Sequence, residues 1–156
     1  MSQPLLFHAV VKSLPELEDL SVWTGLAHLP DLKPADLSRV SGLKLGGLAH
    51  ASFLLDTLSC IGPQLVSLKL ETIYFDVPID ELAVACPALE ELSIVNARAA
   101  LSANVTRQQK TLERLKLVYL FLVQYADTQY TALHYILKQA VGLESLQVRI
   151  QILKIC

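Results

Sequence analysis

Apolar residues in this chain follow one spacing that returns six times. Each occurrence has the form apolar-x-x-apolar-x-apolar, in which x is most often a polar residue. The six occurrences are Leu17, Leu20, Val22; Val40, Leu43, Leu45; Leu65, Leu68, Leu70; Leu89, Leu92, Ile94; Leu112, Leu115, Leu117; and Leu143, Leu146, Val148. Their first residues are separated by steps of 23, 25, 24, 23 and 31 residues. A period this regular indicates an internal repeat.

The repeat contains two kinds of local pattern. The last two apolar residues of each occurrence alternate with polar ones, as in a strand with one buried face. We therefore expect strands near residues 19–23, 42–46, 67–71, 91–95, 114–118 and 145–149. Between strands the spacing changes to i, i+3, i+4, i+7, which predicts amphipathic helices. It occurs at Ala51, Leu54, Leu55, Leu58; at Ile79, Leu82, Ala83, Cys86; and at Leu133, Ile136, Leu137, Ala140.

A strand and a helix that recur every ~24 residues cannot bury their apolar faces alone, so neighbouring units must stack. The steps lie within or near the roughly 20 to 29 residues of leucine-rich repeats. The expected fold is an α/β leucine-rich-repeat solenoid of about six repeats, forming a short horseshoe arc. A parallel β-sheet would line its concave face and helices its convex face, in a single domain over residues 1–156 or a fragment of a longer repeat protein.

Some stretches depart from the regular unit. Residues 25–34 contain three prolines or glycines and predict a loop, whereas 98–109 give only a weak helical pattern. The long fifth step predicts an insertion near residues 121–131 that would emerge as a loop. At the N-terminus, an apolar spacing at Leu6, Ala9 and Val10 predicts a helical cap.

One repeat carries a more specific phrase, Cys86-Pro87-Ala88-Leu89-Glu90-Glu91-Leu92-Ser93-Ile94. It resembles the cysteine-containing leucine-rich repeats of F-box proteins, in which C-P-x-L-x-x-L-x-L recurs. That resemblance implies a substrate-recognition module of a ubiquitin ligase, with the repeats gripping the protein to be modified. No F-box segment is recognisable in the sequence, and the repeats lack the asparagine often found at the ninth repeat position.

Equal repeat positions form rows across such a sheet, because adjacent strands lie about 4.8 Å apart. The residues expected on the concave face and chosen as partner-binding candidates are Trp23, Lys44, Lys69, Glu71, Glu91, Arg114, Lys116 and Arg149. Lysine recurs in the middle row, which predicts a modest basic stripe that receives an acidic segment of a protein partner. The alternative is that these lysines form a solvated face, and that Trp23 packs on the first repeat.

Composition narrows the function. The chain is 53% hydrophobic but has no run of about 20 apolar residues, so we expect no membrane-spanning helix. A net charge of −2 with mixed signs argues against nucleic-acid binding. Three widely spaced cysteines and the lack of a basic, apolar leader favour a reducing compartment, the cytoplasm or alternatively the nucleus.

We find no motif for catalysis, for a cofactor or for a metal. The four histidines are scattered, and Cys86 falls on an apolar helical stripe as a buried small residue. We therefore expect a non-enzymatic protein-interaction module. The main alternative is an inhibitor or scaffold of the ribonuclease-inhibitor type with no link to a ligase.

The last predicted strand has a consequence of its own. Leu146, Val148, Ile150 and Ile152 alternate with polar residues close to the C-terminus, which predicts an apolar edge strand. We expect either self-association through this edge or a truncated product.

Overall fold

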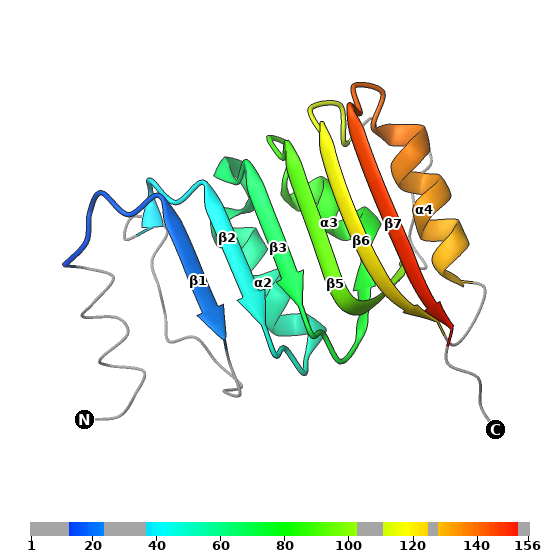
Figure 1. Cartoon of the computed structure of the whole chain (residues 1–156). Coiled ribbons are helices and arrows are strands. Elements are labelled where there is room, and N and C mark those ends of the chain that lie inside the picture. Colours follow the sequence, from blue (N-terminus) through cyan, green and yellow to red (C-terminus); the bar gives the residue numbers. More distant parts are fainter. Residues whose placement is uncertain (1–12, 24–36, 103–110, 125–127, 153–156) are drawn as a thin grey trace.

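The computed structural model of the chain describes residues 13–23, 37–102, 111–124 and 128–152. Within these ranges the fold is α/β, with a sheet of seven parallel strands and three α-helices (Figure 1). The strands are β1 (Asp19–Trp23), β2 (Gly42–Gly46), β3 (Ser67–Glu71), β4 (Asp76–Pro78), β5 (Glu91–Ala100), β6 (Leu117–Gln124) and β7 (Ser145–Ile152). The helices are α2 (Ala51–Ile61), α3 (Ile79–Ala85) and α4 (Thr128–Gln139), and the short 3-10 helix η2 (Gly62–Gln64) follows α2.

Six of the strands lie side by side in chain order, and β4 pairs only with the far part of β5. From β1 through β5 the pairing joins equal repeat positions, so that Lys44 lies opposite Lys69 and Lys69 opposite Ser93. In Figure 1 helices α2 and α3 lie behind the sheet, α4 lies beside β7, and the front of the sheet carries no described helix. Helix α4 also contacts α3, so the three helices belong to one layer. The prediction of a parallel sheet with helices on one side is therefore confirmed.

The core lies between the sheet and the helices. In β3, Leu68 and Leu70 are 0% and 1% exposed, whereas Lys69 between them points to solvent. Helix α2 buries Leu54 and Leu58 on the facing side, as its apolar spacing predicts. Each leucine buried in this way contributes roughly 1.5–3 kcal/mol relative to an exposed one. The other two predicted helices are confirmed as α3 and α4.

A residue with left-handed backbone recurs at one repeat position: it follows β2 and β3 directly and lies within β5, where the pairing with β6 is irregular. Gly47, Thr72 and Asn96 have φ angles of 69°, 54° and 53°, and the residues just before them are paired in register. The Asn96 amide nitrogen donates a hydrogen bond to Thr72 Oγ1 at 3.4 Å. A left-handed conformation costs a non-glycine residue roughly 1–2 kcal/mol. The left-handed conformation therefore recurs at one repeat position in three neighbouring units.

The prediction of a strand at residues 114–118 is wrong. Strand β6 covers Leu117–Gln124, and Leu117 lies opposite Glu91 of β5. The expected partner of Glu91 was Arg114, so the sequence-based register was three residues out. The neighbouring register with β7 pairs Leu117 with Ser145 and continues without a shift to the end of both strands.

The cause of this error is a second match to the same spacing. Leu115, Val118 and Leu120 also fit apolar-x-x-apolar-x-apolar, and they are 0%, 3% and 0% exposed. Leu117, assigned to the core from the sequence, is 41% exposed. The observed register wins because it turns three consecutive alternate residues, ending at Leu122 with 1% exposure, toward the helices.

Two other expectations are corrected. The loop predicted over residues 121–131 is wrong where it can be compared, because residues 121–124 belong to β6 and residues 128–131 to α4. The weak helical pattern at 98–109 begins in strand, since β5 continues to Ala100 beside β4. The predicted loop at 25–34 and the N-terminal cap at Leu6, Ala9 and Val10 lie outside the described residues.

Among the residues that the structure describes, none of the helices has the length and apolar character needed to cross a bilayer.

Candidate binding surface on the open sheet face

The sheet side opposite the helices is called the open face here. Its residues alternate with the buried leucines and form three rows across the strands. The first row is Asp19, Gly42, Ser67, Glu91, Leu117 and Ser145; the middle row is Ser21, Lys44, Lys69, Ser93, Tyr119 and Gln147; the third is Trp23, Gly46, Glu71, Val95, Phe121 and Arg149.

Six of the eight candidate residues lie on this face. These are Trp23, Lys44, Lys69, Glu71, Glu91 and Arg149. The other two, Arg114 and Lys116, do not lie in the rows, because they precede the first residue of β6. Their places are taken by Leu117 and Tyr119, which the sequence-based register missed. The signal that finds them is the alternative apolar spacing that starts at Leu115.

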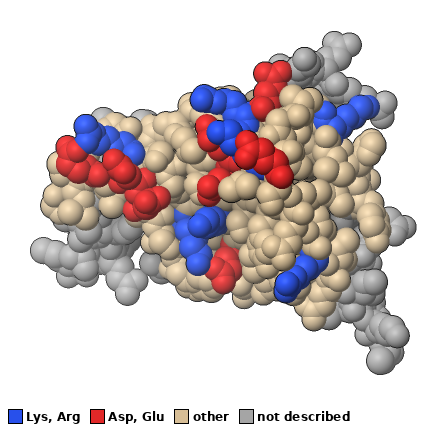
Figure 2. Space-filling model, turned by 45° about the horizontal axis from the view of Figure 1, so that its top comes forward, with Lys and Arg blue, Asp and Glu red and all other residues tan. Residues whose placement is uncertain are grey.

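Ion pairs neutralise most of the predicted basic stripe. Lys44 Nζ lies 2.8 Å from Glu71 Oε2, which relieves the like charge of Lys69 on the adjacent strand. Lys116 Nζ lies 2.9 Å from Glu90 Oε2, and Arg114 Nη2 is 3.9 Å from Glu90 Oε1. Figure 2 shows the result as groups in which blue side chains mostly adjoin red ones rather than as a continuous blue band.

The Lys116–Glu90 contact shifts both titrations. The hydrogen bond from Lys116 lowers the pKa of the Glu90 carboxyl, and the same bond raises the pKa of the Lys116 amino group. Both groups are therefore charged at neutral pH. The stability that the lowered Glu90 pKa contributes is lost only as the pH falls through the ordinary glutamate range and below it. As a surface pair it stabilises the fold little.

Lys69 differs from these neighbours. It is exposed, and it has no ion-pair partner among the described residues. Glu91, on the next strand, accepts a hydrogen bond from Ser67 Oγ at 3.4 Å. Lys69 thus presents its ammonium group to solvent near the centre of the sheet, where a partner could reach it.

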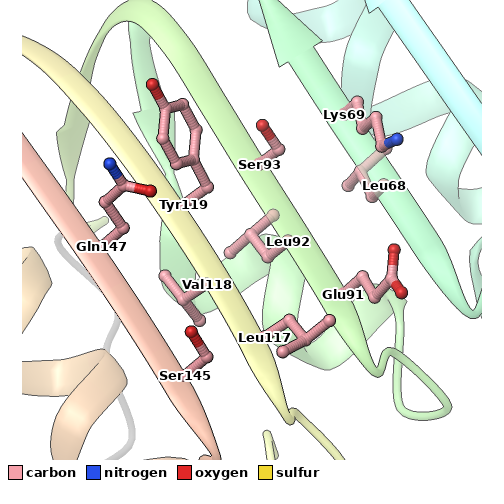
Figure 3. A pocket seen from close by; sticks show the side chains of 10 residues that line it. All are labelled: Leu68, Lys69, Glu91, Leu92, Ser93, Leu117, Val118, Tyr119, Ser145 and Gln147. Carbon is pink, nitrogen blue, oxygen red and sulfur yellow. The ribbon is translucent and has the colours of Figure 1, made fainter.

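Lys69 also lines a shallow hollow that crosses β3, β5, β6 and β7. The hollow has a volume of about 340 Å³. Figure 3 shows Tyr119 and Gln147 at one side of it, Lys69 and Glu91 at the other, and Ser93 between them. The remaining lining residues are Leu68, Leu92, Leu117, Val118 and Ser145. A partly exposed leucine, a phenol and an ammonium group without an ion-pair partner in the described ranges therefore line a single depression.

A second feature lies at the β1 edge of the open face. The Trp23 indole covers Gly46, so that a Cβ atom on Gly46 would meet ring atom Cε3 at 2.2 Å. Trp23 is still 63% exposed. Packing on the neighbouring strand and availability to a partner are therefore compatible for this residue.

Groups suited to catalysis are sparse in the described part of the chain. No three His, Cys, Asp or Glu side chains within it cluster as a metal site would require. Cys86 is buried, as predicted, and burial raises the pKa of its thiol to about 12, which keeps it protonated at neutral pH. Cys60 is exposed. Asp80 is buried, but its carboxylate accepts hydrogen bonds from the backbone nitrogen and the hydroxyl of Ser102.

Comparison with known proteins gives no relative. No protein-family model matches the chain, and neither a curated protein nor a solved structure is significantly similar to it. Function is therefore inferred from the residues of the open face and their geometry.

Proposed function

We propose that the chain is a leucine-rich-repeat solenoid that binds another protein through its open face, the concave side of the arc. Three observations support the repeat assignment. Strands β2, β3 and β5 pair at equal repeat positions, a left-handed residue recurs at one of these positions, and an α-helix lies between β2 and β3 and between β4 and β5. Repeats of this kind expose one extended sheet surface, which suits the binding of a protein better than catalysis, which needs an enclosed site.

The hollow beside Lys69 is the observation that carries the proposal. A protein partner gains most where an apolar side chain is covered and a charge is paired at the same place. Leu117 is 41% exposed and Tyr119 is half-buried, so an apolar side chain of a partner could cover both. Lys69 would pair with a carboxylate two or three residues further along the same extended segment.

The sequence requirement for this ligand is more specific than a general acidic character. Lys44 and Lys116 already have carboxylate partners, so a highly acidic ligand would have to displace them. Lys69 and Arg149 are the two open-face cations without an ion pair among the described residues. We therefore expect a segment with one or two acidic residues flanking a bulky apolar residue.

The cellular role we propose is substrate recognition in an F-box-type ubiquitin ligase context. It is supported by the phrase Cys86–Ile94, whose Cys86, Leu89, Leu92 and Ile94 are the buried residues of one unit. An inhibitor or scaffold of the ribonuclease-inhibitor type would use the same open face. The identity of the bound protein separates the two: a ligase adaptor with its substrate, or an enzyme whose turnover falls on binding.

The test begins with affinity purification and mass spectrometry, followed by binding measurements on the captured protein. We expect Lys69→Glu to weaken binding by about tenfold or more, because it places a negative charge against the partner's carboxylate. Leu117→Ser should also weaken binding, by removing the apolar contact. The matched controls are Lys138→Glu on α4 and Val84→Ser on α3, both exposed on the helical side.

The controls distinguish a contact at the open face from a general effect of charge or polarity. Equal loss of binding in Lys69→Glu and Lys138→Glu would mean that the change in net charge, and not a contact at the open face, weakens binding. Unchanged binding in both open-face variants, with the fold intact by circular dichroism, would contradict the open face as the binding surface.

A further inference from the structure

Strand β7 leaves apolar side chains uncovered that earlier strands bury. Leu146 is 39% exposed, whereas Leu92 and Val118 at the equal positions of β5 and β6 are 1% and 3% exposed. Val148 and Ile150, on the same side of β7, are only half-buried. Leucine and valine side chains at these positions are therefore poised for burial that the described residues do not supply.

The helical layer is apolar at this end as well. Leu137 on α4 is 47% exposed, and Val141, between α4 and β7, is 75% exposed. Leu137, Val141 and Leu146 thus expose apolar side chains on the last helix, the last strand and the connection between them. Exposed apolar side chains that gather at one end of a fold favour an interaction site there.

The backbone of β7 offers the complementary feature. It is the last strand in the sheet order, so one of its two edges has no strand partner among the described residues. Its eight residues contain no proline, and its pairing with β6 has no bulge. Natural edge strands are usually protected from pairing by such devices or by several charges. Arg149 is the single charged residue of this strand.

We propose that a second copy of the chain docks on this edge through an antiparallel β7–β7 pair centred on Val148. Two identical strands related by a two-fold axis perpendicular to the sheet keep the same faces together only if the axis passes through a residue pair such as Val148–Val148. In that register Leu146 lies opposite Ile150 of the second copy. Their uncovered apolar sides then cover each other.

The polar side of β7 selects the same register. Centring on Val148 places Gln147 opposite Arg149 of the second copy, twice by symmetry. Centring one residue later would place the two Arg149 side chains directly opposite each other, and like charges at opposed positions destabilise a strand pair. Centring on Ile150 would leave Leu146, and centring on Gln147 would leave Ile150, with no residue of β7 opposite it. Val148 is thus the centre that pairs Leu146, Val148 and Ile150 within β7 without opposing charges.

The dimer would join two sheets into one and place both sets of helices on the same side. The two open faces would then continue into each other across the β7 pair. This inference does not depend on the partner proposed for the open face, because the dimer is held by the backbone edge of β7 and its helix-side apolar residues, with Gln147 and Arg149 of the open face only selecting the register.

A pair of surface substitutions tests the register without disturbing the core. Gln147→Glu should tighten the dimer, because each new carboxylate faces Arg149 of the other copy. Gln147→Arg should raise the dimer dissociation constant by roughly fivefold, because two arginine pairs would then be opposed. Sedimentation equilibrium over a range of protein concentrations measures both constants. Opposite shifts support the proposal, and equal shifts in one direction overturn it.

Cross-linking tests the centre of symmetry directly. In a background carrying Cys60→Ser and Cys156→Ser, Val148→Cys should form a disulfide-linked dimer under mild oxidation, because opposed Cβ atoms lie about 4.5–5.5 Å apart. Leu146→Cys is the matched control and should not cross-link, since its partner is Ile150. A wild-type chain that sediments as a monomer at all concentrations, or equal cross-linking from both positions, would overturn the proposal.

Discussion

Position 46 has no room for a side chain, because the indole of Trp23 on the preceding strand covers it. The indole lies across the glycine, and the ring atoms Cε3, Cζ3 and Cδ2 would come within 2.2 to 2.9 Å of an added Cβ. Trp23 is the single tryptophan of the chain. Its fluorescence therefore reports on this one contact and on any partner that reaches this edge of the open face.

The contact can be tested with two glycine substitutions. Gly46→Ala should displace the indole and change its emission maximum and its quenching by iodide. Gly42→Ala is the control, because its Cβ would meet Asp19 Oδ1 at 2.0 Å and would leave the indole in place. Both variants should change the free energy of unfolding by less than about 1 kcal/mol, since a side chain can move in each case. Identical spectra for the two variants would contradict the placement of Trp23.

At the scale of the element, β6 shows how a strand selects its register. The sequence Leu117–Gln124 alternates partly exposed side chains with Val118, Leu120 and Leu122, which are buried. A shift of even one residue would turn the buried set to solvent. The register is therefore fixed by packing against the helices rather than by the strand's own sequence alone.

Two alanine variants distinguish the observed register from the one expected at 114–118. Leu120→Ala should lower the free energy of unfolding by about 2–5 kcal/mol, because its side chain is fully buried. Leu117→Ala should lower it by less than about 1 kcal/mol, because Leu117 is 41% exposed. Urea denaturation measures both. A larger loss for Leu117→Ala than for Leu120→Ala would favour the register that the structure rejects.

The contrast between β3 and β6 explains which elements can be predicted from sequence. In β3 lysine separates two leucines, so only one register hides the apolar residues and the strand is found where expected. Around β6 apolar residues occupy Leu112, Leu115, Leu117, Val118 and Leu120, so two registers satisfy the same spacing. The choice depends on contacts with β5 and the helices, which a single-sequence pattern does not contain.

Each candidate binding residue was placed correctly or incorrectly together with its strand. Lys44, Lys69 and Glu71 lie on the open face because their strands are unambiguous. Arg114 and Lys116 were misplaced with β6, and Tyr119 was missed for the same reason. The pairing of Lys44 with Glu71 was foreseeable from the like charge on the adjacent strand, whereas the Lys116–Glu90 pair follows only from the corrected register.

At the scale of the whole molecule, each strand of the main sheet pairs only with its immediate neighbours in the sheet. Stability in such an array is close to a sum of units and interfaces, so the ends open more easily than the middle. The burial of β1 and β2 already differs. Leu20 and Val22 are half-buried, whereas Leu43 and Leu45 are 2% and 0% exposed.

Amide hydrogen exchange should follow this gradient. We expect the amides of β3 and β5 to exchange slowest. Those of β1 should exchange roughly tenfold faster or more, because a terminal unit can open while the other units stay folded. Mass-spectrometric exchange measures the profile at low protein concentration, where β7 pairs with β6 and not with a second copy. Equal protection of β1 and β3 would show instead that the sheet opens as one unit.

The left-handed residues shared by β2, β3 and β5 have a consequence for how such a chain can lengthen. Gly47, Thr72 and Asn96 occupy the same repeat position, and the strand residues before them share one register. A unit copied in frame between two of these residues would meet neighbours of the same shape on both sides. Duplication of a gene segment could therefore widen the sheet by one rung while leaving the joints that already exist untouched.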